Sequence, residues 1–202
     1  MVHLRPPDIE FKATMANRTS MRAFVAMDLP PSVLDTLSSF LSLLSYSGAD
    51  LKIVDRENLH FTVKFLGEIT DAQAREADSR LGRLDLPPFH LEIKGVGAFP
   101  DITRPRVVWA GAAGGREKLV AAARAIMGSL EGIGERDERP FQPHVTVARV
   151  RSPANNRALQ ELIQGNAERV FGEADINEFK LKSSRLTPDG PIYSDLGAYR
   201  LS

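Results

Sequence analysis

Hydrophobic and polar positions alternate in two short segments of matching pattern, His60-Phe61-Thr62-Val63 and His144-Val145-Thr146-Val147. β-Branched and aromatic residues dominate both segments, and the side chains of a strand alternate between its two faces with period 2. The pattern therefore predicts two strands, each with a His and a Thr on one face and two apolar side chains on the other. The apolar pairs can pack into a core, which leaves the polar pairs on the opposite surface.

The same order of elements, namely strand, helix, motif strand, helix and strand, is expected on both sides of the middle of the chain. In the first half the expected elements are a strand at 21–29, a helix from a Ser32 cap to 47, a short extended piece at 51–54, the motif strand at 60–66 ended by Gly67, a helix from a Thr70 or Asp71 cap to about 84, and a strand at 89–99 with a bulge at Gly95 or Gly97. In the second half they are a strand at 106–111, a helix at 117–130, the motif strand from 144, a helix at 155–163, a strand at 176–186, and a strand at 192–201 after a turn at 188–191.

This weak internal repeat predicts two similar units. If they pack about a pseudo-twofold axis, the His and Thr pairs of the two motifs meet across a central groove, although 84 positions separate His60 from His144. The alternation of elements predicts an α+β fold with largely antiparallel sheets, and it leaves a parallel sheet open.

Composition limits the possible functions. A chain of 202 residues with 43% hydrophobic content forms one large domain or two packed lobes. Its 26 basic and 26 acidic residues give no net charge, which argues against nonspecific binding of long nucleic acid but leaves a small or terminal nucleotide open. Because the chain has no cysteine, disulfides, thiol catalysis and thiolate metal sites are excluded, and a reducing cytoplasm fits.

The N-terminal segment, residues 1–20, is charged and lacks the continuous apolar run of a secretory signal. We interpret it as an extension that is disordered or was added artificially, with the folded domain at 21–202 beginning at Met21. No uninterrupted apolar run in the sequence approaches the roughly 20 residues that cross a membrane.

Two imidazoles and two hydroxyls facing one groove suit a phosphate ester. An imidazole titrates near pH 6.5, so one copy can accept a proton while the other donates one, and a threonine hydroxyl can donate a hydrogen bond to a phosphate oxygen. A single histidine on a sheet would more simply satisfy a structural hydrogen bond, and Thr is a good strand former. The repeated pairing at the same spacing favours catalysis and phosphate binding.

Other candidates for substrate contact lie near the motifs. Lys64 falls on the face of the first motif's His and Thr if the strand is regular, although a solvated lysine is an equal alternative. Arg149 follows the second motif threonine by three, so a phosphate contact requires a bulge or the end of the strand. Phe141 and Tyr193 are candidates to line the cleft and stack a base, whereas Trp109 is a better candidate for core packing.

Metal and nucleotide-cofactor chemistry lack support in the sequence. Asp55, Glu57 and Glu68 lie near the first motif but show no recognisable ligand spacing. The sequence also lacks a phosphate loop and a dinucleotide-binding glycine fingerprint. We therefore expect neither a metal nor a cofactor.

At these residues the sequence resembles the 2H phosphoesterase superfamily, and within it the RNA 2′,3′-cyclic phosphodiesterase branch, also called the 2′-5′ RNA ligase family. The resemblance covers nearly all of 21–201. It rests on Met-Arg-Ala-Phe-Val-Ala-Met-Asp-Leu-Pro at 21–30, Asn-Leu-His-Phe-Thr-Val-Lys-Phe-Leu-Gly at 58–67, Pro-Arg-Val-Val-Trp-Ala-Gly at 105–111, Phe-Gln-Pro-His-Val-Thr-Val-Ala-Arg at 141–149, and Ser-Arg-Leu-Thr-Pro-Asp-Gly-Pro-Ile-Tyr at 184–193.

The resemblance implies a bilobal fold of two pseudo-twofold-related lobes, with mainly antiparallel sheets, helices outside and a central cleft. It implies metal-independent hydrolysis of a 2′,3′-cyclic phosphate to a 2′-phosphate, with His144 as proton acceptor, His60 as proton donor, and Thr62 and Thr146 on the phosphate. The expected partners are RNA ends or nucleotides with a 2′,3′-cyclic phosphate, and we expect a cytoplasmic monomer that binds no membrane.

Two alternatives stay open. The first is a 2H enzyme for another reaction, such as 2′-5′ ligation, cleavage of 2′-5′ oligoadenylate or opening of an ADP-ribose cyclic phosphate. The second is a nonenzymatic module that binds nucleotides or RNA ends. Residues outside the motifs decide between them.

Overall fold

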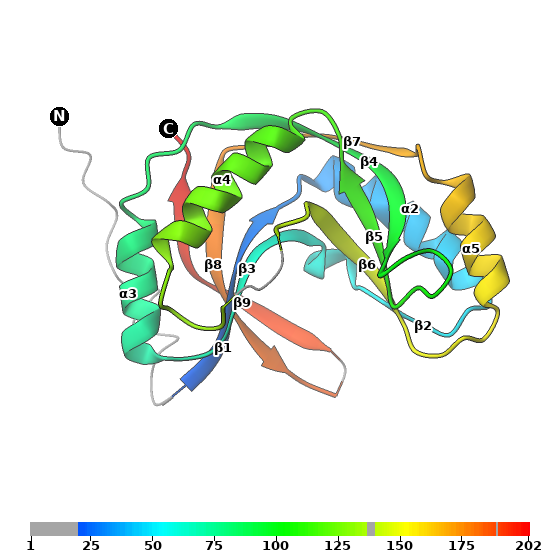
Figure 1. The fold of residues 1–202 in the computed structure, drawn as a ribbon, viewed down its shortest axis with the longest axis horizontal. Coiled ribbons are helices and arrows are strands. Elements are labelled where there is room, and N and C mark those ends of the chain that lie inside the picture. The colour runs from blue at the N-terminus through cyan, green and yellow to red at the C-terminus, as the bar shows by residue number, and fades with distance from the viewer. Residues whose placement is uncertain (1–19, 137–139, 189) are drawn as a thin grey trace.

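A computed structural model describes residues 20–136, 140–188 and 190–202 as one curved sheet with helices packed against it (Figure 1). The strands are β1 Ser20–Asp28, β2 Leu51–Ile53, β3 His60–Thr70, β4 Phe89–Phe99, β5 Val107–Ala112, β6 His144–Val150, β7 Val170–Ile176, β8 Glu178–Leu186 and β9 Pro191–Arg200. The helices are α2 Pro31–Tyr46, α3 Asp71–Leu81, α4 Arg116–Ser129 and α5 Asn156–Gly165, with a 3₁₀ turn, η1, at Arg56–Asn58. The expected extension at 1–20 lies outside the described residues apart from Ser20.

The strand order, β7-β4-β5-β6-β3-β1-β8-β9, is symmetric about the central pair β6 and β3, and β2 pairs with β6. All of these strand pairs are antiparallel, so the antiparallel prediction is confirmed. We call β3, β1, β8 and β9 the His60 lobe, and β7, β4, β5, β6 and β2 the His144 lobe. The two halves of the sequence interlock, because β8 and β9 come from the second half and complete the His60 lobe, whereas β4 comes from the first half and joins the His144 lobe.

The helices cover the apolar side of the sheet. Helix α2 packs on β7 and β2, α5 on β4, and α3 on β3 and β1, while α4 contacts both β3 and β4. The apolar positions of the motif strands lie in this core as predicted, since Phe61 and Val145 are fully buried. Burying the apolar side leaves the opposite surface of the central strands for the polar motif residues.

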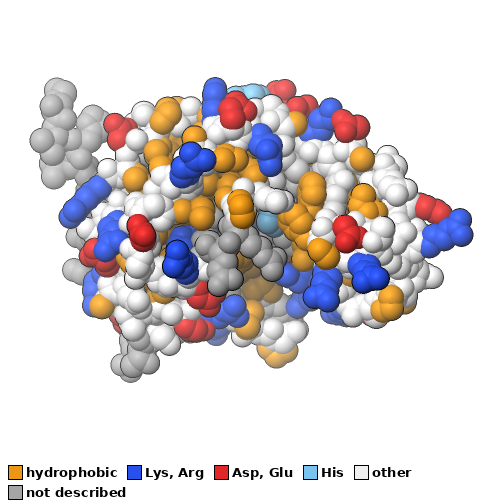
Figure 2. Space-filling model, viewed as in Figure 1, with side chains coloured by type: hydrophobic (Ala, Val, Ile, Leu, Met, Phe, Trp, Pro, Cys, Tyr) orange, Lys and Arg blue, Asp and Glu red, His pale blue; other side chains and the backbone are white. Residues whose placement is uncertain are grey.

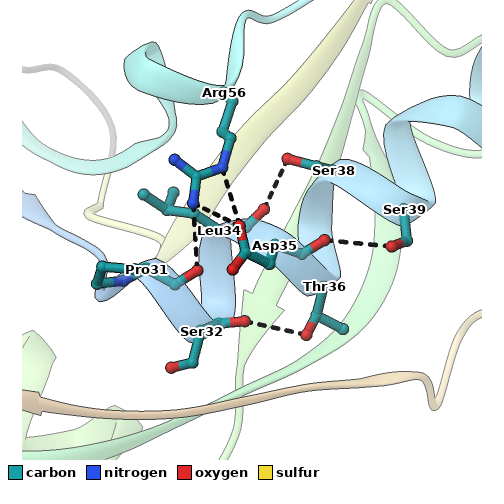
Figure 3. A network of polar contacts seen from close by, with 8 residues as sticks. All are labelled: Pro31, Ser32, Leu34, Asp35, Thr36, Ser38, Ser39 and Arg56. Carbon is teal, nitrogen blue, oxygen red and sulfur yellow. Dashed lines mark hydrogen bonds and ion pairs between the residues drawn. The ribbon is translucent and has the colours of Figure 1, made fainter.

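The turn that precedes β3 is anchored to helix α2. Arg56 in η1 donates hydrogen bonds to the Asp35 carboxylate and to the Pro31 carbonyl at the start of α2 (Figure 3). The hydroxyls of Thr36 and Ser39 donate to backbone carbonyls one turn earlier in the same helix. Because η1 ends two residues before His60, these contacts link the start of the first motif strand to α2.

Several expected boundaries are wrong for identifiable reasons. Helix α2 starts at Pro31 and is capped by Pro30 rather than Ser32, since proline is well suited to the first helical position. Gly67 does not end β3, because its φ of 68° lets it sit within the strand at a shift in register with β1. The Thr70 cap is confirmed and forms a capping box with Gln73, although α3 ends at Leu81.

Strand β7 was not predicted. It pairs with β4 at the edge of the sheet, and Gly172 lies within it with a φ of 130°. Glycine and two acidic residues weaken the strand signal of Val170–Ile176. Among the helices of the described ranges, none combines the length and apolar character needed to cross a membrane.

Candidate active site

Each motif strand carries a bulge at the same place. Val63 has no partner on β1, because the register passes from Lys64 opposite Val25 to Thr62 opposite Ala26. Val147 likewise has no partner on β5, since the register passes from Ala148 to Thr146. The two strands therefore share one burial pattern. In each, the motif His and Thr are half-buried, the residue between them is buried, and the two residues after the Thr are buried.

The bulge in β3 removes Lys64 from the face on which a regular strand would place it. Lys64 is only 7% exposed, and its ammonium donates a hydrogen bond to the Glu135 carbonyl at 3.0 Å. The expectation that Lys64 shares a strand face with His60 and Thr62 is wrong for this reason. The Lys64 ammonium is instead buried, where it binds a backbone carbonyl.

Replacing Lys64 with Met should lower the free energy of unfolding by about 1–3 kcal/mol, because the Glu135 carbonyl loses its ammonium donor. The KM for substrate should stay near that of the unchanged protein. Urea denaturation and steady-state kinetics measure the two quantities, with the exposed Lys118→Met as control. If Lys64→Met instead raised KM without changing the free energy of unfolding, the Lys64 ammonium would be a substrate contact.

The bulge in β6 has the opposite consequence for Arg149. Arg149 is exposed and follows Thr146 by three positions, beyond the bulge. Its charge adds to the burial that lowers the pKa of His144 and opposes the burial that raises the pKa of Tyr193. Phe65 holds the equivalent position on β3 and is 53% exposed, with its ring centroid 6.0 Å from that of Phe24. A phosphate contact by Arg149 requires a bulge or the end of the strand, and β6 has such a bulge before Arg149.

The two motif strands are hydrogen-bonded neighbours, and Phe61 stands opposite Val145 in an antiparallel pair. This antiparallel register sets His60 opposite Thr146 and Thr62 opposite His144. The pairing of β3 with β6 thus sets the two histidines on neighbouring strands and on one face of the sheet. In Figure 2, hydrophobic side chains and a histidine gather at the middle of the visible face, with Lys and Arg side chains around them.

A backbone carbonyl two residues earlier in the chain orients the His144 ring. Its Nδ1 donates to the Gln142 carbonyl at 2.7 Å, and its ring meets Phe99 edge-on with centroids 5.0 Å apart. A neutral imidazole that donates through Nδ1 has a free lone pair on Nε2. Burial lowers the pKa of His144, the Gln142 carbonyl opposes that change, and Arg149 adds to it. His144 is therefore suited to accept a proton at neutral pH.

His60 lies in an aromatic surround. Its ring stacks on Phe24 at 5.1 Å and meets Tyr193 edge-on at 5.5 Å, while Nε2 lies 2.9 Å from the Thr62 hydroxyl oxygen. Burial, with a smaller contribution from Lys182, lowers the pKa of His60 to about 4, although a hydrogen bond to the Asn58 backbone acts in the opposite direction. His60 is therefore neutral at pH 7 in the free protein.

A pocket of about 230 Å³ is lined by Phe99, the ring that His144 meets edge-on. Phe99, Trp109 and Gln142 contribute to its wall. The Trp109 indole fills the space above Gly97, where a Cβ atom would come within 2.2 Å of the ring. Trp109 is only partly buried, so it is a wall of the pocket rather than a core residue.

The structure also locates the remaining candidates. Tyr193 contacts His60, as described above, whereas Phe141 is half-buried and packs against the main core. Sequence reasoning missed Phe24 and Phe99, the rings that hold the two imidazoles. Both lie in strands far from the motifs in sequence, and only the strand order brings them to the histidines.

Comparison with known proteins gives a consistent family. The family model described as "LigT like Phosphoesterase" matches twice, at residues 27–109 and 111–193. The RNA 2′,3′-cyclic phosphodiesterase of Archaeoglobus fulgidus is 37% identical over 179 residues, which are 89% of this chain and 99% of that protein. That of Aquifex aeolicus is 40% identical over 153 residues, 72% of this chain and 81% of that one.

Solved structures show the same fold. E. coli LigT complexed with 3′-AMP superposes with a TM-score of 0.74 at 25% identity, covering 91% of this chain and 99% of that one. The Thermus thermophilus protein TT0787 gives a TM-score of 0.71 at 31% identity, covering 90% and 98% of the two chains. The double match of the family model agrees with the two interlocked halves of the sheet.

Proposed function

Since the chain belongs to the LigT-like phosphoesterase family, we propose that it hydrolyses an RNA 2′,3′-cyclic phosphate to a 2′-phosphate by acid–base catalysis between two histidines. The antiparallel pairing of the two motif strands carries the proposal, because it turns two distant His and Thr pairs toward one surface. The relatives that carry the name RNA 2′,3′-cyclic phosphodiesterase support the choice of substrate.

In the proposed reaction, His144 Nε2 takes a proton from water as the water oxygen forms a bond to phosphorus. His60 protonates the 3′ oxygen as the bond between phosphorus and that oxygen breaks. The substrate anion favours the charged form of a nearby imidazole, so His60 gains its proton when substrate binds. Thr62 and Thr146 donate hydrogen bonds to the nonbridging oxygens, where negative charge grows in the transition state.

The proposal extends to the partners and the location of the protein. We infer that its ligands are RNA ends or nucleotides, in keeping with the 3′-AMP complex of E. coli LigT. We further propose that it acts as a cytoplasmic monomer without a metal or cofactor. Activity should therefore persist in excess EDTA, and inhibition that added metal reverses would favour a metallohydrolase.

The direct test is incubation with 2′,3′-cyclic mononucleotides, oligonucleotides with a cyclic end, 2′-5′ oligoadenylate and ADP-ribose cyclic phosphate. Phosphorus NMR then locates the product phosphate. We expect a 2′-phosphate from the cyclic-ended RNA. Turnover of another ester alone would overturn the substrate, and binding without turnover would identify a nonenzymatic module.

The pH profile of kcat/KM should be a bell centred below pH 6.5. This parameter reports groups of the free enzyme, and the pKa values of His60, about 4, and His144 are both lowered. Raising the pH removes the proton that His60 must donate, and lowering it protonates the base His144. Initial rates at low substrate concentration across pH 4–9 measure the profile. A flat profile would contradict the paired imidazoles.

Arg149→Met should raise KM about 10- to 100-fold, the usual range for losing one hydrogen bond to a charged group. The reason is that Arg149 is exposed three positions after Thr146, beyond the bulge in β6. Arg157→Met is the matched control, because Arg157 is exposed on α5 and pairs with Glu161. Equal effects of the two substitutions would remove Arg149 from the substrate site.

A further inference from the structure

The pocket beside Phe99 lies on the same face of the sheet as the second motif. In the pairing of β5 with β6, Trp109 stands opposite Thr146 and Gly111 stands opposite His144. Side chains directly opposite each other share one face of a sheet, and both Trp109 and Gly111 line the pocket. The pocket therefore begins one strand away from His144 and extends from the motif surface into the His144 lobe.

Glycine residues leave the space that this pocket occupies. Gly111 has no side chain to fill the position beside His144, and a Cβ atom there would come within 2.8 Å of the Lys94 carbonyl oxygen. Gly95, with a φ of 86°, lines the pocket within a shift in the register of β4. Glycine in a strand often marks a place that a ligand approaches closely. Sites for drug-sized molecules span roughly 300–1,000 Å³, so a pocket of about 230 Å³ suits one planar ring system rather than a complete nucleotide.

The lining of the pocket combines aromatic and cationic side chains. The Phe99 and Trp109 ring centroids lie 5.4 Å apart. Lys94 and Arg116 add two positive charges. Lys94 Nζ lies 3.0 Å from Glu168, whereas no described residue forms an ion pair or hydrogen bond with the exposed Arg116 side chain. Bases stack on aromatic rings and guanidinium groups bind phosphates, so the lining matches a base with its adjoining phosphate.

The proposed reaction indicates which nucleotide this is. Water activated by His144 attacks phosphorus in line with the 3′ oxygen that His60 protonates, so the ribose with the cyclic phosphate lies toward His60. Phe24 and Tyr193 surround His60 with aromatic rings on that side. The pocket lies beyond His144, on the other side of the phosphorus, and is left for a different nucleotide.

We propose that the pocket binds the base of a second nucleotide, one that does not carry the cyclic phosphate, and that Arg116 binds the adjoining backbone phosphate. This inference deepens the proposed function and rests on it for the nature of the ligand. The second nucleotide belongs either to the same RNA chain or to a separate one, and the chemistry of recognition is the same.

The test uses the fluorescence of Trp109, which is the only tryptophan of the chain and therefore reports on the pocket directly. A diadenosine dinucleotide ending in a 2′-phosphate should change this emission, because its second base packs on the indole. Calorimetry should show that it binds about 5- to 150-fold more tightly than adenosine 2′-phosphate, the contribution of one stacked base. The same dinucleotide with an abasic second residue should lose this gain.

A separate RNA is tested with adenylyl-adenosine that lacks a terminal phosphate, added after adenosine 2′-phosphate has saturated the protein. A change in Trp109 emission at this step assigns the pocket to a second chain. A response to the 2′-phosphate dinucleotide alone assigns the pocket to the neighbouring nucleotide of the same chain.

Arg116→Met should weaken binding of the bound dinucleotide about 10- to 100-fold, the range for losing a hydrogen bond to a charged group. Binding of adenosine 2′-phosphate should stay unchanged. Lys118→Met is the matched control, because Lys118 is exposed on the same helix and is not among the residues that line the pocket. Equal losses in the two variants would overturn the contact with Arg116.

The proposal is overturned if neither dinucleotide changes the Trp109 emission, or if adenosine 2′-phosphate alone changes it as much. The ligand series uses the unchanged protein, so it decides even if Arg116→Met does not fold. None of the ligands contains a cyclic phosphate, so binding is measured apart from turnover. Hydrolysis of cyclic-ended RNA without any response of Trp109 would reject the pocket and keep the proposed function, whereas a response without hydrolysis would do the reverse.

Discussion

Replacing His60 or His144 with Gln should lower kcat by about 10²–10⁴-fold, the range for loss of one general acid or base. Glutamine retains a polar side chain of similar reach but cannot exchange a proton near neutral pH. Because each ring is held through its neighbours, His144 by Gln142 and His60 by Phe24, the rest of the cleft should stay in place. KM should change far less than kcat.

His90→Gln provides the matched control for these two variants. His90 also lies in a strand, but it is exposed and pairs with Asp175 and Glu173 at the opposite end of β4 from Phe99. Steady-state kinetics on a cyclic-ended oligonucleotide measure all three variants, and thermal unfolding checks that each is folded. Full activity in either motif variant would end the two-histidine mechanism.

Replacing Thr62 or Thr146 with Val should lower kcat by about 10²–10³-fold, the typical cost of removing one donor to a developing oxyanion. Valine matches threonine in shape and favours strands, so the backbone of the motif should be kept. The Thr62 change should be the more severe of the two, because its hydroxyl also contacts His60 Nε2 at 2.9 Å.

Serine substitutions at the same positions separate the hydroxyl from the methyl group and should recover most of the lost rate. Thr36→Val on the exposed surface of α2, where the hydroxyl donates to the Ser32 carbonyl, is the control. If the valine variants raise KM and leave kcat intact, the hydroxyls bind the ground state and do not stabilise the transition state.

The motif residues could be found from sequence because alternation with period 2 fixes the face of each side chain up to the first irregularity. The prediction holds for Phe61 and Val145, which are buried, and for the half-buried histidines and threonines. It fails immediately after Val63, where the bulge buries Lys64. The second motif shows the same failure with the opposite result at Arg149. A bulge leaves no clear mark in a run of β-branched residues, so its position could not be predicted.

The aromatic and charged surroundings of the histidines were beyond the reach of sequence patterns for another reason. Phe24, Phe99 and Lys182 reach the site through strand order, and local periodicity carries no information about which strands become neighbours. The weak repeat predicted two similar units, and the double family match supports them. The repeat did not reveal that β4 from the first half of the chain would join the His144 lobe, or that β8 and β9 from the second half would join the His60 lobe.

The crossing of β4 and β8 between lobes makes each half of the chain dependent on its counterpart. A fragment that ends after β4 would contain β1 without its neighbour β8, and β4 without its neighbours β5 and β7. The remaining fragment would contain those missing strands without β1, β3 and β4. Neither fragment could bury its apolar strands alone, whereas the two together could rebuild the whole sheet. Cutting the loop between β4 and β5 should therefore yield a pair of inactive pieces whose mixture restores a working cleft, much as two partners do in a complementation assay.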